Sequence, residues 1–198
     1  GLYLEGSAND YSATYGDSVY LTFEAVNRSP QPARLISIKV KQLNLDKDIN
    51  VPLNNNEKVD TKIGIVVPEN FEISQPYWLK EEGSLGMFKV DDQQMIGKAQ
   101  NGNAFDIEFA LDINGTVIKY KKAVIYKRND PVKGEVYRPF VITPPVATSI
   151  AGSVWMFPDD GVRKVRVSVK AGKDSVSGSV YLELPGGWSS TPNSFNYA

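Results

Sequence analysis

The fold class is decided by the stretch Ala104-Phe-Asp-Ile-Glu-Phe-Ala-Leu-Asp-Ile113, which is followed by Asn114-Gly115 and a second run from Thr116 to Tyr126. Apolar residues occupy every second position of the first run, which is the period of a strand with one buried face. Asn-Gly is a preferred pair for a two-residue type I′ turn. The sequence therefore predicts an antiparallel hairpin here.

Further short runs of strand-like sequence lie on both sides of this hairpin. They are Val19–Val26, Leu35–Leu45, Val59–Val67, Tyr137–Ile142, Val154–Phe157, Val162–Lys170 and Val176–Leu184. The polar, Asn-rich segment from Asp46 to Lys58 is interpreted as a loop. No segment has a sustained helical period. Many short strands separated by turn residues predict an all-β fold, and specifically an immunoglobulin-like β-sandwich.

The segment from Tyr126 to Val146 is dense in turn residues and marks a domain boundary. Pro144-Pro145 breaks the chain, so we predict one sandwich over residues 1–145 and a second unit over residues 146–198. A complete seven-strand sandwich takes roughly 100 residues. The second unit is therefore expected to be truncated, or to have its sheet completed by another chain.

The composition argues against most enzyme classes. The 198 residues include no histidine and no cysteine, and the formal net charge is −1. The usual zinc ligands and the common nucleophile activators are thus missing together. We expect no catalytic activity, no catalytic residues, no metal site and no cofactor in this chain. The balanced charge gives no reason to expect nucleic-acid binding.

Neither end of the chain suggests a membrane segment. No apolar run approaches the ~20 residues that span a bilayer, so membrane insertion is not expected. Gly1 is not preceded by Met, and no signal peptide is visible. These features predict that the sequence is part of a longer protein.

Several groups of charged residues are candidate sites. Carboxylates occur close together at Asp91-Asp92, Asp159-Asp160 and Asp46/Asp48, and solvated turns explain them better than calcium binding. Basic residues gather at Lys119, Lys121, Lys122, Lys127 and Arg128. A solvated face that discourages edge-to-edge strand pairing is preferred there over an anion-binding site.

The sequence also contains N-glycosylation sequons at Asn27 and Asn114. These motifs are short and common, so they carry little weight.

Four aromatic residues are the candidates for contact with a glycan: Trp188, Trp78, Tyr77 and Trp155. Aromatic rings can stack on the apolar face of a sugar, with amide or carboxylate groups beside them. The alternative is that Trp78 and Trp155 fill a core, which we favour for these two. Trp188 follows Pro185-Gly-Gly187, a loop sequence, and the two interpretations are balanced there.

Four segments together resemble a known family. They are Val26-Asn-Arg-Ser-Pro30, Ile73-Ser-Gln-Pro-Tyr-Trp-Leu79, Gly86-Met-Phe88, and Asp130–Phe140 with Pro144-Pro145-Val146. In this order they are similar to the region that follows the catalytic domain in Bacteroidetes PIG-L (LmbE-like) deacetylases. The resemblance covers nearly the whole chain. Phe157-Pro-Asp-Asp160 echoes the zinc motif of that family, but Phe stands where a ligand His is needed, so no catalytic residue is transferred.

The resemblance implies an accessory module of a periplasmic or secreted deacetylase of N-acetylated sugars. Such a module would contact the catalytic domain of the parent chain, position the enzyme, or bind glycan weakly. The second hypothesis is a purely structural spacer that docks on a catalytic domain or a partner subunit. A third is a strand-mediated dimer formed through the unfinished second unit.

Overall fold

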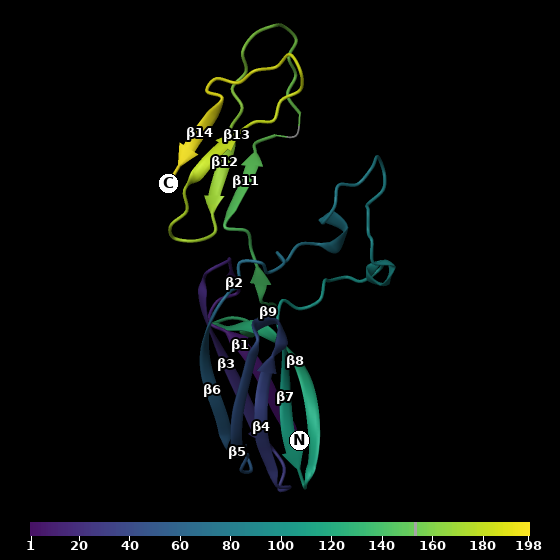
Figure 1. The fold of residues 1–198 in the computed structure, drawn as a ribbon, viewed down its shortest axis with the longest axis vertical. Helices are drawn as coiled ribbons and strands as arrows, with labels where there is room; N and C mark the ends of the chain where they lie inside the picture. Colours follow the sequence, from purple (N-terminus) through teal and green to yellow (C-terminus); the bar gives the residue numbers. More distant parts are fainter. Residues whose placement is uncertain (153) are drawn as a thin grey trace. The chain divides into compact units, whose positions relative to one another are not determined.

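The computed structural model describes residues 1–152 and 154–198, and all of its regular structure beyond single 3-10 turns is β. The chain divides into two compact units, Gly1–Thr143 and Pro144–Ala198 (Figure 1). The all-β prediction is confirmed. None of the helical turns in the described residues is long and apolar enough to cross a bilayer.

The first unit contains ten strands and three 3-10 turns. The strands are β1 (Leu2–Ala8), β2 (Ser12–Ala13), β3 (Ser18–Asn27), β4 (Ala33–Val40), β5 (Leu45–Pro52), β6 (Lys58–Val66), β7 (Asp106–Ile113), β8 (Thr116–Asp130), β9 (Gly134–Pro139) and β10 (Val141–Ile142). The turns are η1 (Lys41–Leu43), η2 (Tyr77–Leu79) and η3 (Gln93–Met95).

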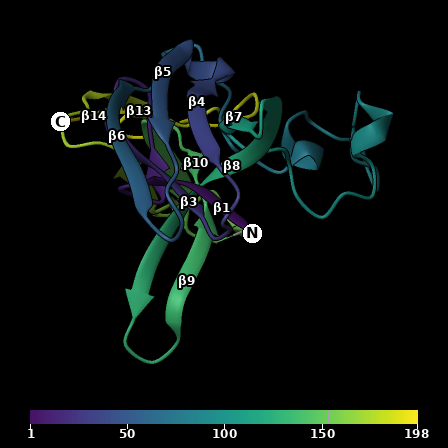
Figure 2. The same cartoon turned by 90° about the horizontal axis from the view of Figure 1, so that it is seen from below.

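Strand β8 joins the two halves of the main sheet, whose order is β5-β4-β7-β8-β1-β3-β6. Residues 116–123 of β8 pair with β7, residues 124–126 pair with β1 in parallel, and residues 125–130 pair with β9. The sheet folds over at this strand, so that β1 faces β7: a Cβ at Gly6 would overlap the Ile107 side chain. Figure 2 shows the two halves end-on, with the β8–β9 ribbon extending away from them.

The core lies between these two halves. Alternate residues of β3, β4 and β7 are buried, and Phe23 of β3 meets Phe109 of β7 edge to face, with ring centroids 6.4 Å apart. At one end, Phe105 stacks on Phe140 and touches Phe71. Alternating apolar side chains thus build the interior that the strand pattern predicts.

The Asn114-Gly115 hairpin is confirmed, since Ile113 pairs with Thr116 and both turn residues have positive φ (51° and 82°). The loop interpretation of residues 46–58 is wrong for most of the segment, which forms β5. This strand lies at the sheet edge and is exposed along most of its length, so it needs no apolar alternation. Residues 154–157 are not a strand.

A polar network ties β1 to β8 on the outer surface of the sheet. Glu5 lies directly opposite Glu24 of β3, and the Lys127 ammonium pairs with Glu5 and lies 3.8 Å from Glu24. The Tyr3 hydroxyl donates to Glu5 Oε2 at 2.7 Å. The Glu5 side chain is only 8% exposed. Lys127 therefore does not belong to a solvated basic face, contrary to the prediction for its cluster.

The second unit is built of two ribbons: β11 (Val146–Ile150) with β12 (Val167–Ala171), and β13 (Gly178–Tyr181) with β14 (Ser194–Tyr197). Both ribbons are antiparallel and in continuous register. Long connections without regular structure run through residues 151–152 and 154–166 in the first ribbon and 182–193 in the second. None of the described residues in this unit is buried.

Candidate functional site: an arm between β6 and β7

Residues 68–104, which we call the arm, leave the sheet after β6 and return to it at β7 (Figure 1). The arm is rich in polar and turn residues and carries only the 3-10 turns η2 and η3. It is nevertheless anchored to the first unit. The Ser74 amide donates to the Ile142 carbonyl at 2.8 Å, the Ile142 amide donates to Ser74 Oγ at 2.9 Å, and the Phe71 ring touches Phe105.

Tyr77 closes the arm on itself. Its amide donates to Asn101 Oδ1 at 3.0 Å, and its hydroxyl donates to the Lys98 carbonyl at 3.3 Å. The Gly97 amide donates to the same hydroxyl at 3.2 Å. Asn101 Nδ2 donates in turn to the Gln75 carbonyl. The polar end of Tyr77 is thus used to hold two segments of the arm together.

The tip of the arm is a tight turn. The Ser84 amide donates to the Met87 carbonyl at 3.0 Å, and the Met87 amide donates back to Ser84 at 3.1 Å. Gly86 has φ = +79°, which favours glycine, and a Cβ at Gly83 would collide with the Met87 carbonyl oxygen. The sequence Gly-Ser-Leu-Gly-Met therefore holds a fixed backbone shape.

Large apolar side chains are exposed along the arm. Leu85 at the tip is fully exposed, and Met87 and Phe88 are 70% and 66% exposed. Leu79 and Ile96 are exposed as well. A pinned segment that shows this much apolar side chain to solvent has the character of an interaction surface.

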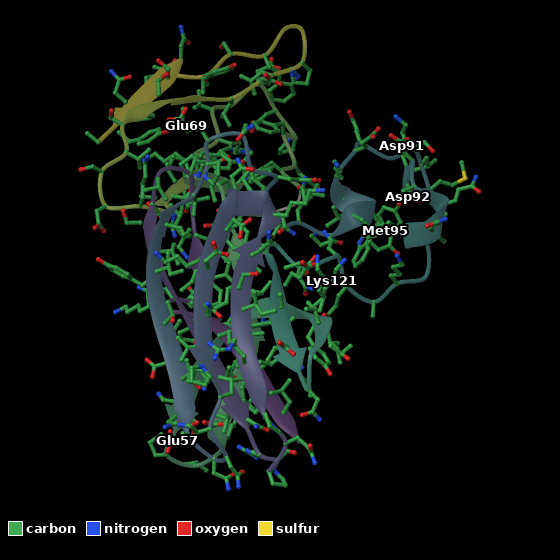
Figure 3. The ribbon with its side chains drawn as sticks, turned by 60° about the horizontal axis from the view of Figure 1, so that its bottom comes forward. Glu57, Glu69, Asp91, Asp92, Met95 and Lys121 are labelled. Atoms are coloured by element: carbon green, nitrogen blue, oxygen red, sulfur yellow. The ribbon has the colours of Figure 1, made fainter. Side chains whose placement is uncertain are left out.

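A cleft of about 740 Å³ lies beneath the arm. Its lining combines the Phe71 and Tyr77 rings with amide, carboxylate and ammonium groups from the arm and from the turn after β4: Gln42, Asn44, Asn70, Glu72, Gln75, Lys80, Glu81, Lys89, Asp91, Asp92, Asn101 and Asn103. Figure 3 shows Asp91, Asp92 and Met95 on the arm, with Glu57 at the other end of the strands.

The charges of the cleft pair with one another. Lys80 lies 2.7 Å from Glu72, and Lys89 pairs with Glu81. The hydrogen bond from Lys89 lowers the pKa of Glu81, and the bond to Glu72 raises the pKa of Lys80. Both shifts favour the charged forms at neutral pH, so these groups are not tuned for proton transfer. Among the described residues, no three His, Cys, Asp or Glu side chains are grouped to hold a metal ion.

The four aromatic candidates lie in different units. Tyr77 and Trp78 are neighbours in the arm, with their rings edge to face at 4.9 Å, and both are half-buried. Trp155 and Trp188 belong to the second unit. Trp188 is 51% exposed and contacts the Phe157 ring edge to face at 4.6 Å, while Trp155 is half-buried beside Gly152.

The apolar tip and the Phe157–Trp188 pair are features that the sequence interpretation missed. The two glycines on either side of Leu85, Gly83 and Gly86, are the sequence feature that could have predicted an exposed tight turn there. Asp159, in the segment that echoes a zinc motif, accepts hydrogen bonds from the Gly161 amide at 2.9 Å and from Arg163 at 3.2 Å. It behaves as a turn residue, as expected.

Asn27, the first sequon position, is a structural residue. Its side chain is buried, and its amide nitrogen donates to the Gln31 carbonyl at 2.8 Å and to the Leu53 carbonyl at 3.1 Å. This nitrogen would have to leave both partners to be glycosylated. Asn114 is exposed in its hairpin turn.

In comparisons with family models, curated proteins and solved structures, none matches this chain.

Proposed function

We propose that this chain is a non-catalytic accessory module of a larger, PIG-L-like deacetylase of N-acetylated sugars, and that the arm docks the module on the catalytic domain. In this proposal the first unit is an immunoglobulin-like sandwich that carries the arm. The parent protein works in the periplasm or outside the cell. The module itself performs no chemistry and serves to position the enzyme.

The observation that carries the proposal is the apolar tip of the arm. Leu85, Met87 and Phe88 are exposed on a turn whose backbone is held by reciprocal hydrogen bonds. Because Tyr77 and Ser74 also pin the arm, little conformational entropy remains to be lost when a partner covers these side chains. Two of the four segments that resemble the family, Ile73–Leu79 and Gly86–Phe88, lie on this same arm.

Docking through the arm is tested by binding of this chain to the zinc deacetylase domain encoded in the same gene. We expect calorimetry to detect a complex and the double substitution Leu85→Asp/Phe88→Asp to weaken it at least tenfold, because two apolar contacts would be replaced by buried charges. Val132→Asp is the matched control, since Val132 is equally apolar and 92% exposed but lies in the β8–β9 turn. Equal affinity of all three proteins, or a gene without a deacetylase domain, would refute the proposal.

Weak glycan contact through Trp188 is a second candidate function. A half-exposed indole beside the Phe157 ring offers an apolar platform for a sugar. We expect N-acetylglucosamine oligomers or peptidoglycan fragments to change the tryptophan fluorescence of the wild type and of Trp78→Phe, but not of Trp188→Ala. If no fragment changes the signal while docking persists, the module is a purely structural spacer.

A further inference from the structure

The second unit exposes many large apolar side chains. None of its described residues is buried, and its two-stranded ribbons lack a third strand. An isolated two-stranded ribbon is marginally stable at best. The unit therefore needs a cover over its ribbons.

The outer strands of the two units differ in charge. In the first unit the edge strands β5 and β6 and the ribbon strand β9 all carry Lys, Arg, Asp or Glu, and β5 and β9 also contain Pro. Charges and prolines of this kind discourage edge-to-edge pairing. In the second unit, β11, β13 and β14 contain no charged residue, and none occurs from Leu184 to Ala198. Strand β12 carries Lys170, so the uncharged edges that are left open to pairing are those of β11, β13 and β14.

The sequence of β14 fits a second copy of itself. In an antiparallel pair of β14 strands centred on Asn196, the two Asn196 residues lie opposite each other. Phe195 of each copy then lies opposite Tyr197 of the other on one face. Such cross-strand aromatic pairs stabilise a sheet. We propose that two copies of this chain associate through β14, forming a continuous four-stranded sheet around a two-fold axis.

The available surface and charge are consistent with a dimer. Nine large apolar side chains of this unit are exposed: Ile150, Val154, Met156, Phe157, Val162, Tyr181, Leu184, Trp188 and Phe195. Of these, Phe195 belongs to β14 and Tyr181 to its partner strand β13, so these two are the ones that a β14 pair can cover directly. The unit carries five basic and four acidic side chains, a formal net charge of +1, so two copies do not repel strongly.

The proposal is tested by light scattering on the whole chain over a hundredfold range of concentration. The wild type is expected to rise from 21.9 kDa toward twice that mass. Asn196→Lys is expected to remain at the monomer mass, because it sets two ammonium groups against each other on the two-fold axis. Asn196 is exposed, so circular dichroism should show an unchanged fold.

Ser149→Lys is the matched control, since Ser149 is exposed in β11, a strand of the other ribbon that also carries no charged residue. It is expected to dimerise like the wild type. A monomeric wild type at every concentration overturns the proposal and leaves the surface to a different partner. A dimer that survives Asn196→Lys but is lost in Ser149→Lys overturns it in favour of β11. This test is independent of docking through the arm.

Discussion

Replacing Phe109 by alanine is expected to lower the free energy of unfolding of the first unit by about 3–5 kcal/mol. Phe109 is fully buried in the middle of β7, between β4 and β8, and its ring meets Phe23 from the opposite half of the sheet. The loss combines the transfer of a phenyl ring to water with the cavity that it leaves. Urea titration followed by far-ultraviolet circular dichroism measures it.

Phe88→Ala is the matched control for this substitution. It removes the same ring from a position that is 66% exposed, so we expect a change below about 0.5 kcal/mol. A loss of less than about 1 kcal/mol for Phe109→Ala would mean that the two halves of the sheet do not enclose a packed core.

The second large effect is expected from Lys127→Met, which should cost about 2–4 kcal/mol. It removes the ammonium that lies between Glu5 and Glu24 and leaves the covered Glu5 carboxylate without its ion-pair partner. The cost stays below that of a fully buried pair because the Lys127 side chain is 28% exposed. Chemical denaturation of wild type and variant at neutral pH measures the difference.

The double variant Glu5→Gln/Lys127→Met is the control, and it should recover part of the loss because the Glu5 carboxylate is no longer left without its ion-pair partner.

The stability of the protein at alkaline pH tests the same network. Burial and the hydrogen bond to Glu5 raise the pKa of Tyr3 to about 12, and the bond to Glu5 raises the pKa of Lys127. The unfolded chain releases these protons first, so stability should fall as the pH rises from about 10 to 12. Tyr3→Phe should reduce that fall; identical pH profiles would contradict the network.

The sequence predicted the parts of the fold that depend on local pattern. The β7–β8 hairpin followed from apolar alternation and Asn114-Gly115, because both signals lie within a few residues of one another. Strand β5 was missed since an edge strand buries little and tolerates Asp46 and Asp48. Strand β1 has a glycine at position 6, where any side chain would overlap the side chain of Ile107, a residue far away in the sequence. No local window contains that contact.

The candidate site was predictable only in outline. The aromatic character of Tyr77 and Trp78 is visible in the sequence, but the hydrogen bonds by which the Tyr77 hydroxyl closes the arm depend on Gly97 and Lys98, about twenty residues away. The pairing of Phe157 with Trp188 joins two loops of the second unit. Their meeting is a product of tertiary packing. The ion pair between Lys127 and Glu5 joins residues 122 positions apart, and nothing in the sequence around either residue indicates it.

The position of β1 between β3 and β8 has a consequence for the order of folding. Strands β1, β3 and β6 can associate early, whereas Gly6 pairs with Val124, which lies more than a hundred positions later in the chain than Gly6 and is synthesised after all three strands. Until then one edge of β1 is open and Glu5 has no lysine beside it. Closure by β8 is a late, long-range step of the kind that slows folding. Until β8 pairs with it, the open edge of β1 is a place where the emerging chain can aggregate.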